Sequence, residues 1–235
     1  MIRPRWRKVL HDLTGNLSRT ALVVASIAVG VFSIGVIIGA YVIISGDMSA
    51  SYAANNPMNI DLRTEPFDED LLSTIQDMGG VKEAEGRRVF VMRVRPAGSE
   101  KWVTLNVVAI DDYANLEINR LNVITGTNHP GNRQILLEKK AFEEIDTTVG
   151  GLLEVELLDG RIKTMDVAGI VQDPATGAGD FLAQPFAYVT MDSMQYLGQP
   201  ETYNRMFVTL SEGNNDEATL RNMGGTVRNR PRARP

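Results

Sequence analysis

The sequence contains no cysteine and only two histidines among its 235 residues. Without cysteine the chain forms no disulfide and offers no thiolate to a metal ion. His11 lies in a basic N-terminal segment, and His129 lies in the turn-like GTNHPG, where we interpret it as a solvated turn residue. Two histidines so placed do not readily assemble a catalytic triad or a His-rich metal site.

Nucleotide-binding and ion-binding motifs are also missing. No G-x-x-x-x-G-K-[ST] loop occurs, so ATP would have to be hydrolysed by another subunit. The acidic clusters at 68–70, 111–112 and 143–144 lack the spacing of an ion-binding loop and are typical of helix starts or solvated faces. The glycine-rich segment 173–180 predicts a mobile loop rather than a phosphate cradle. We therefore expect no catalytic residue, no cofactor, no metal and no enzymatic activity.

One stretch lacks charge altogether, from Thr20 to Ser45. As a helix it would reach about 39 Å, more than the ~30 Å hydrocarbon core of a bilayer. Its few polar side chains are Thr20, Ser26, Ser33, Tyr41 and Ser45. The stretch predicts a transmembrane helix over residues 20–45. A cleaved signal sequence ending at the SAS of 49–51 is the alternative, although the apolar regions of such signals are usually shorter, at about 7–15 residues.

Charge on the two sides of this stretch differs in sign. The bases before it are Arg3, Arg5, Arg7, Lys8 and Arg19, opposed by one acid, Asp12. Asp47 follows it with no base nearby. The positive-inside rule predicts a cytoplasmic N-terminus, with most of the chain extracytoplasmic. Since the whole chain carries a net charge of −5, that outer part is acidic, and we expect no nucleic acid as partner.

Residues 1–19 carry a second membrane signal. Apolar residues recur at helical spacing, with the bases on the other sides. The pattern is typical of an amphipathic helix in the cytoplasmic interface, in contact with membrane lipid and anchored by Trp6, Leu10 and Leu13. A plain basic segment with chance periodicity is the alternative.

Small residues recur within the predicted span. Gly35 and Gly39 form one pair a helical turn apart, and Ser26 with Gly30 forms another. Small residues at this spacing let a neighbouring backbone approach closely, which favours association of helices in lipid. We predict that these four residues contribute to helix packing.

The remainder predicts alternating strands and helices, and hence an α+β domain with a mostly antiparallel sheet. NIDLR predicts a strand, and FDEDLLSTIQDMGG a helix with Leu71, Leu72, Ile75 and Met78 on one face. RRVFVMRVRP and KWVTLNVVAID predict one hairpin, and LLEVELLDGRIKTMDVAGIV a second that turns at Asp159-Gly160. RQILLEKKAFEEI predicts a strand followed by a helix. FAYVTM, DSMQYLG, RMFVTLS and NDEATLRNM predict strand, helix, strand, helix.

The pieces follow one another in a definite order: the basic N-terminal helix, the long span, NIDLR…FDEDLLSTI, VAGIVQDP and FAYVTMDSMQYLG…NRMFVTLSE. In this order they resemble the MacB/FtsX-like ABC transporter permeases over residues 1–222. The resemblance implies two extracytoplasmic subdomains, one from 59–91 with 185–223 and one from the residues between. It also implies a cytoplasmic ABC ATPase as partner, together with a second permease subunit or a homodimer. The location that it implies is a bacterial-type inner membrane, which the chain crosses once. The first span would relay ATPase-driven motion to a domain that moves or releases a substrate.

The sequence departs from that pattern after residue 223. Residues 46–223 correspond to the core domain, whereas 224–235 read GGTVRNRPRARP, a basic tail that we predict to be disordered. The family has three further spans and a cytoplasmic loop at this point. We expect a truncated or frameshifted permease; a single-span relative and a functional basic tail are the alternatives.

The functional expectation is a membrane permease subunit, or a fragment of one. The alternative from another class is a single-span anchored binding or adaptor module without an ATPase partner. A domain secreted after cleavage near Ser51 is a third reading.

Overall fold

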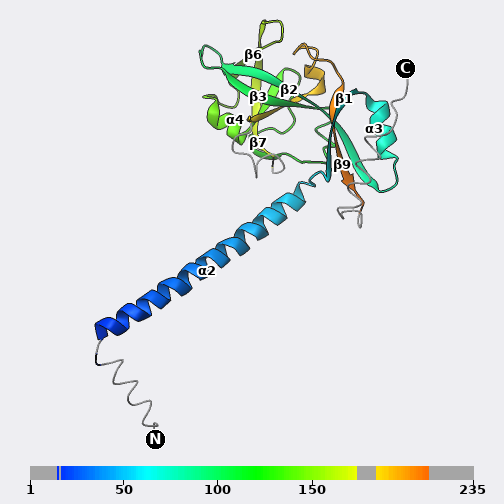
Figure 1. Cartoon of the computed structure of the whole chain (residues 1–235). Helices are drawn as coiled ribbons and strands as arrows, with labels where there is room; N and C mark the ends of the chain where they lie inside the picture. Colours follow the sequence, from blue (N-terminus) through cyan, green and yellow to red (C-terminus); the bar gives the residue numbers. More distant parts are fainter. Residues whose placement is uncertain (1–14, 16, 174–183, 212–235) are drawn as a thin grey trace. The chain divides into compact units, whose positions relative to one another are not determined.

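The structure, a computed structural model, describes residue 15, residues 17–173 and residues 184–211. The chain divides into two units, Met1–Ser51 and Tyr52–Pro235. Figure 1 shows that the first consists mainly of one long helix and that all labelled strands belong to the second.

The long helix α2 runs from Leu17 to Ala54. Its segment Leu17–Ile43 is long and apolar enough to cross a membrane, and its side chains are exposed. Phe32, for example, is 72% exposed. The predicted N-terminal membrane helix is therefore confirmed as a candidate span, which begins at Leu17 rather than at Thr20.

Polar side chains within α2 bond to the helix itself. The hydroxyls of Ser26 and Ser33 donate to the carbonyl oxygens of Leu22 and Val29, one turn earlier, at 2.9 and 2.8 Å. Internal bonds of this kind satisfy hydroxyl groups where no water is at hand. The two serines therefore do not disqualify the helix as a membrane span.

The second unit is built mainly of strands. Its elements are β1 (Ile60–Phe67), α3 (Glu69–Gln76), β2 (Val81–Pro96), β3 (Val103–Ile110), β4 (Asn122–Gly126), β5 (Gln134–Glu138), α4 (Lys139–Glu144), β6 (Leu152–Glu156), β7 (Ile162–Gln172), β8 (Phe186–Thr190), the 3₁₀ turn η1 (Met191–Ser193) and β9 (Tyr203–Leu210). The predicted α+β class is confirmed.

The described strands form one mixed sheet in the order β1-β9-β2-β3-β8-β5-β7-β4. β6 lies off this path because it pairs with both β2 and β7. The pairings of β2, β3, β8, β5, β7 and β6 thus close a six-stranded ring, whereas β9 and β1 extend from β2 as a short open sheet. Only β3–β8 and β5–β7 are parallel among the described pairings. The domain is mostly antiparallel, as predicted.

β2 is the strand that joins the two parts. Residues Val81–Arg87 pair with β9, residues Arg88–Val94 pair with β3, and Arg93–Pro96 pair also with β6. Because β2 is 16 residues long, its first half pairs within the open sheet and its second half pairs within the ring. The two predicted subdomains therefore share a strand.

The ring is held together by alternating apolar side chains. In β5, Ile135 and Leu137 enter the larger core, whereas Leu136 between them enters a smaller outer cluster. In β8, Val189 and Tyr188 divide in the same way. Successive strand residues point to opposite faces, so the larger core takes the inward side chains of the ring and the outer cluster lies against the ring's exterior. The larger core also includes residues of β9 and α3.

The helix α3 is as the sequence predicted. Asp68 caps its N-terminus, with a carboxylate oxygen that accepts a hydrogen bond from the Leu71 amide at 3.4 Å. Ile75 is fully buried, and Leu71, Leu72 and Met78 pack against the same core. The helix ends at Gln76, before the glycine pair at 79–80 that the sequence suggested as its stop.

The structure corrects the assignment of segment 185–190. The family resemblance places this segment with residues 59–91, whereas β8 pairs with β3 and β5 and so belongs to the ring. An apolar run indicates a strand without indicating its partner. The helix predicted over DSMQYLG is reduced to the 3₁₀ turn η1, and the helix predicted over NDEATLRNM lies outside the described residues.

Candidate functional site

The segment that follows α2, residues 55–59, is hydrogen-bonded along its length; we call it the exit segment. The carbonyl oxygens of Asn55 and Asn56 accept from the amides of Arg120 and Asn119, at 3.0 and 3.1 Å. The Asn59 amide donates to Val208 O at 2.9 Å. The exit segment is thus tied first to the loop between β3 and β4 and then to β9.

Asparagine side chains reinforce this attachment. Asn56 Nδ2 donates to Glu117 O at 2.8 Å, and Asn119 Oδ1 accepts from the Met58 amide at 3.0 Å. Both asparagines have positive φ, 45° and 53°. Asparagine is among the few residues other than glycine that adopt this backbone region readily. The residue type therefore suits both the backbone conformation and the bonds.

The loop that receives the exit segment, residues 111–121, is hydrogen-bonded to an ion pair within β2; we call it the junction loop. Glu85 Oε1 accepts from the amides of Glu117 and Ile118 at 2.8 and 2.9 Å, and Oε2 pairs with Arg87. The Arg87 side chain is only 5% exposed and also donates to Ile118 O at 3.4 Å. Removing one partner of a buried pair typically costs about 3–5 kcal/mol, because the other charge stays uncompensated.

Two tyrosines fasten the start of the junction loop. The buried Tyr113 hydroxyl donates to Val189 O in β8 at 2.9 Å, and burial raises its pKa. The Tyr203 hydroxyl of β9 donates to Asp111 Oδ2 at 3.3 Å. Burial and the neighbouring carboxylate of Asp111 raise the pKa of Tyr203 to about 12. The junction loop is therefore bonded to both the open sheet and the ring.

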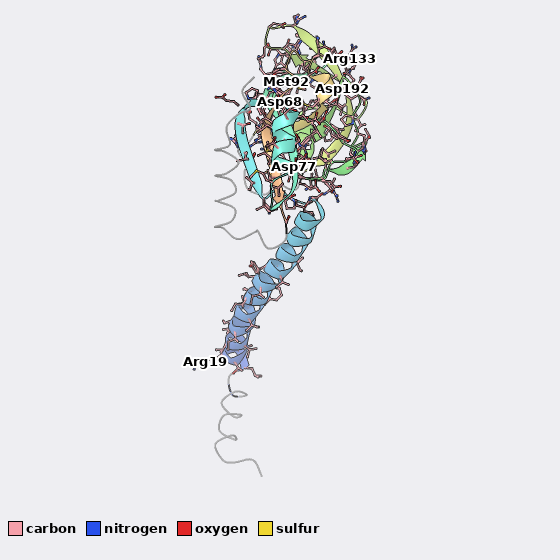
Figure 2. The ribbon with its side chains drawn as sticks, turned by 90° about the vertical axis from the view of Figure 1, so that its right-hand side faces the viewer. Arg19, Asp68, Asp77, Met92, Arg133 and Asp192 are labelled. Carbon is pink, nitrogen blue, oxygen red and sulfur yellow. The ribbon has the colours of Figure 1, made fainter. Side chains whose placement is uncertain are left out.

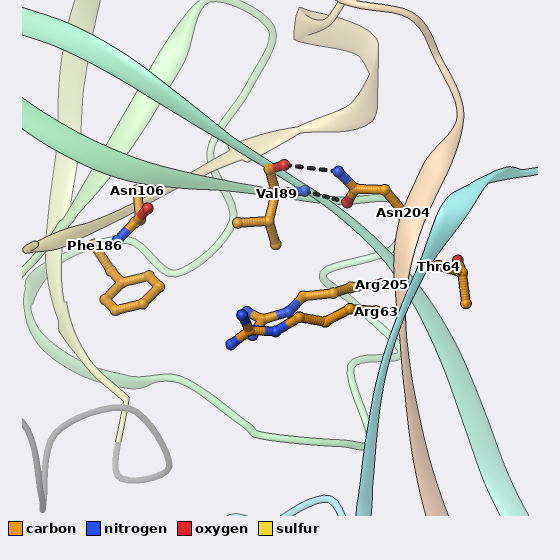
Figure 3. Close-up of a pocket in the computed structure, with 7 residues that line it drawn as sticks. All are labelled: Arg63, Thr64, Val89, Asn106, Phe186, Asn204 and Arg205. Carbon is orange, nitrogen blue, oxygen red and sulfur yellow. Dashed lines mark hydrogen bonds between the residues drawn. The ribbon is translucent and has the colours of Figure 1, made fainter. Parts of the chain in front are cut away.

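The second candidate site is a hollow of about 390 Å³ where the open sheet meets the ring (Figure 3). Its lining residues come from five strands: Arg63 and Thr64 of β1, Val89 of β2, Asn106 of β3, Phe186 of β8, and Asn204 and Arg205 of β9. Figure 3 shows the side chains of Arg63 and Arg205 lying alongside one another in this hollow.

Arg205 is the better partnered of the two arginines. Its Nη2 donates to Asp61 Oδ2 at 2.9 Å, and its side chain is 17% exposed. Burial lowers the pKa of Arg205, Asp61 opposes that shift, and the charge of Arg63 adds to it. Arg63 is exposed and forms no ion pair with a described residue. The hollow therefore carries a surplus of positive charge.

The residues predicted to act in the membrane have different outcomes. Trp6, Leu10 and Leu13 lie outside the described residues, as do most of residues 1–19 and all of 224–235. Ser26, Gly30, Gly35 and Gly39 lie in α2, and a Cβ at any of these glycines would meet no atom within 4 Å. At about 100° per residue the Gly35/Gly39 pair and the Ser26/Gly30 pair lie on roughly opposite sides of the helix. Their role in helix packing stays a prediction. Because the two pairs lie on opposite sides, each pair would contact a different neighbouring helix.

The remaining polar motifs have structural roles. Asp112 Oδ1 accepts from the amides of Ala114 and Asn115 at 2.8 and 3.1 Å, which is a turn within the junction loop. The His129 amide donates to Thr127 Oγ1 at 3.0 Å, also in a turn. Asp173 is buried and accepts from the Tyr188 hydroxyl at 2.9 Å. Within the described part of the chain no group of three or more His, Asp or Glu residues is placed to hold a metal.

Sequence reasoning missed both candidate sites. Glu85 and Arg87 could have been noticed in the sequence. The two charged residues alternate with small residues, and the strand that they begin continues with apolar residues. Arg63 and Arg205 carried no such signal, because their proximity follows from the pairing of β1 with β9, strands from opposite ends of the domain.

Comparison with known proteins finds one matching protein family and several solved structures of similar fold. The model of a family described as the MacB-like periplasmic core domain matches residues 20–224. No curated protein matches the chain.

Among solved structures, the extracellular domain of the noncanonic ABC-type transporter YknZ from Gram-positive bacteria is similar, with a TM-score of 0.50 and 16% identity, over 68% of this chain and 86% of that one. The periplasmic region of MacB from Actinobacillus actinomycetemcomitans aligns with a TM-score of 0.46 and 11% identity, over 72% and 81% of the two chains. At such identities the likeness to YknZ concerns the fold alone.

Proposed function

This chain belongs to the family of MacB-like periplasmic core domains, and on that premise we propose that it relays ATPase-driven motion from the membrane to an extracytoplasmic domain. In this proposal α2 spans the cytoplasmic membrane with its N-terminus in the cytoplasm. ATP is hydrolysed by a separate ABC subunit, and the domain moves or releases a substrate. A second permease subunit or a second copy of the chain completes the membrane part.

The observation that carries the proposal is the bonding of the exit segment. Only Asn55–Asn59 separate α2 from β1, and this segment bonds to the junction loop and to β9. A flexible linker would absorb a displacement of the helix end, whereas a hydrogen-bonded one passes it on. The junction loop is in turn fastened to Glu85 of β2 and through Tyr113 to β8. A displacement of the exit segment would therefore reach both the open sheet and the ring.

The sequence inventory agrees with a relay rather than a catalyst. The chain carries no nucleotide-binding loop, so any ATP-driven step requires a partner that supplies one. Such a partner shifts the state of the domain only through contacts that differ between two states. The span and the exit segment are the parts of this chain through which those contacts would act.

The test is isolation of the native protein from its own membrane in mild detergent, followed by measurement of ATP hydrolysis in the purified complex. We expect an ABC ATPase to co-purify. The double variant Asn56→Gly and Asn119→Gly keeps both positive-φ backbones but removes the side-chain bonds. It should leave the complex intact while loosening the exit segment, seen as faster amide exchange at Met58. Ser99→Gly, in the β2–β3 turn, is the matched control.

Absence of any ATPase from the isolated protein would contradict the proposal. It would favour the alternative of an anchored binding or adaptor module, which has the same fold but needs no motor.

A further inference from the structure

Three arginines lie side by side across the open sheet. In the register of β1, β9 and β2, Arg205 is directly opposite Arg63 on one side and Arg87 on the other. Directly opposed residues share one face of a sheet, and like charges in such positions are destabilising. A row of this kind needs anions nearby.

The chain itself supplies two carboxylates to this row. Asp61 pairs with Arg205 at 2.9 Å, and Glu85 pairs with Arg87 while its other oxygen accepts from the junction loop. Both acids are therefore engaged. Arg63 has no ion-pair partner among the described residues, so one positive charge of the row is left for an external anion.

The surroundings of Arg63 combine apolar walls with polar groups. Phe186 and Val89 form apolar walls of the hollow, and Asn106 adds an amide, whereas the Thr64 side chain points away from the arginines (Figure 3). At about 390 Å³ the hollow is within the size range of small-molecule sites. A small number of cationic groups among apolar walls is typical of sites that orient a small amphipathic ligand.

One wall is fixed by a side chain that is not free to bind. Asn204 Nδ2 donates to Val89 O and Asn204 Oδ1 accepts from the Val89 amide, both at 2.8 Å. These two bonds hold β9 against β2 at the point where the open sheet meets the ring (Figure 3). The wall formed by β2 and β9 is therefore fixed by bonds within the fold.

We propose that this hollow binds a monoanionic carboxylate attached to an apolar body, with the carboxylate between the Arg63 and Arg205 guanidinium groups and the apolar body against Phe186 and Val89. A planar carboxylate matches the fork of N–H donors on a guanidinium. A single negative charge balances the surplus left by Arg63, whereas a phosphate dianion would exceed it. The inference does not depend on ATP-driven motion.

The test uses the full chain in nonionic micelles, with 4-phenylbutyrate as the probe and isothermal titration calorimetry as the measurement. We expect saturable binding. Benzyl alcohol, which lacks the charge, and acetate and inorganic phosphate, which lack the apolar body, should each bind at least about tenfold more weakly.

Variants assign that binding to the hollow. Arg63→Gln removes the unpaired charge at an exposed position and should weaken phenylbutyrate binding at least about tenfold. Arg161→Gln, in the exposed β6–β7 turn, is the control for loss of a surface arginine and should have no effect. Because the probe partitions into the micelle equally in both variants, the difference between their titrations reports binding to the hollow.

Three results would overturn the proposal: no saturable binding, equal affinity for inorganic phosphate, or binding that Arg63→Gln leaves unchanged. Because the measurement involves no ATPase, each of these results leaves the proposed relay function untouched. Conversely, absence of an ATPase partner would not affect the binding.

Discussion

The helix α2 and the six-stranded ring are both rich in valine, isoleucine and leucine, but they place these residues differently. In α2 they lie all around the helix and are exposed, with Leu22 at 70% and Ile37 at 68%. In the ring they recur at alternate positions, and Ile135 and Leu137 are fully buried. The same residue types therefore serve in two different media. The ring excludes water with its own partners, whereas α2 needs an apolar medium from outside, which a lipid bilayer supplies.

The comparison predicts a large contrast between matched leucine substitutions. Leu137→Ala leaves a cavity inside the ring and should lower the free energy of unfolding of the domain by about 2–5 kcal/mol. Leu22→Ala in α2 removes an exposed side chain, and the change should stay within about 0.5 kcal/mol. Denaturant titration of the full chain in micelles, followed by near-UV circular dichroism, measures both. Equal losses of stability in the two variants would contradict the assignment of Leu137 to the core and of Leu22 to a lipid-facing surface.

A second prediction concerns how α2 meets other helices in lipid. Replacing Gly35 and Gly39 by isoleucine should weaken association of the span several-fold in a membrane two-hybrid assay, because the added side chains hold a neighbouring backbone away. Gly30→Ile, on roughly the opposite side of the helix, tests whether a second face is used. Unchanged association in the first variant would mean that these glycines are merely tolerated.

Much of this contrast could be read from the sequence. The uncharged stretch indicated α2, and alternation indicated the strands of both hairpins. The Asp159-Gly160 turn was also predictable, since Gly160 has a φ of 80° and Asp159 Oδ1 accepts from the Arg161 amide at 3.0 Å. These features depend on residues close together in the chain, where local conformation and periodicity decide the outcome.

The remainder depends on pairings between distant segments. The closure of the ring by β6 and β2, and the parallel pairing of β8 with β3, follow from tertiary packing. The strand β4 escaped prediction because all its side chains are exposed and give no clear alternation. Both candidate sites combine residues of β1, β2 and β9 with segments far away, so local pattern could not reveal them.

The smallest predicted effect concerns a carboxyl at the edge of the ring. Burial raises the pKa of Glu138 above its ordinary value, with a contribution from Asp173. Between the unfolded and the raised folded pKa the folded state binds more protons, so stability falls as the pH rises through that window and stays reduced above it. Glu138→Gln should therefore raise the melting temperature slightly at pH 7 and by less near pH 4.

Glu144→Gln, on the exposed side of α4, is the control and should change the melting temperature at neither pH. Thermal unfolding of the full chain at the two pH values provides the measurement. Destabilisation at pH 7 by Glu138→Gln would show that the bond from the Lys140 amide to the Glu138 carboxylate outweighs the cost of burial.

The central claim is that α2 anchors the chain with its domain outside the cytoplasm, and the cysteine-free sequence permits a direct test. Single cysteines are introduced at Ser18, in the first turn of the candidate span, and at Asp159, in the β6–β7 turn. Intact cells whose outer layer has been made permeable are then treated with a membrane-impermeant maleimide. We predict that Asp159→Cys is labelled in intact cells, whereas Ser18→Cys is labelled only after lysis. Labelling of Ser18→Cys alone in intact cells, or release of labelled Asp159→Cys into the medium, would contradict the account.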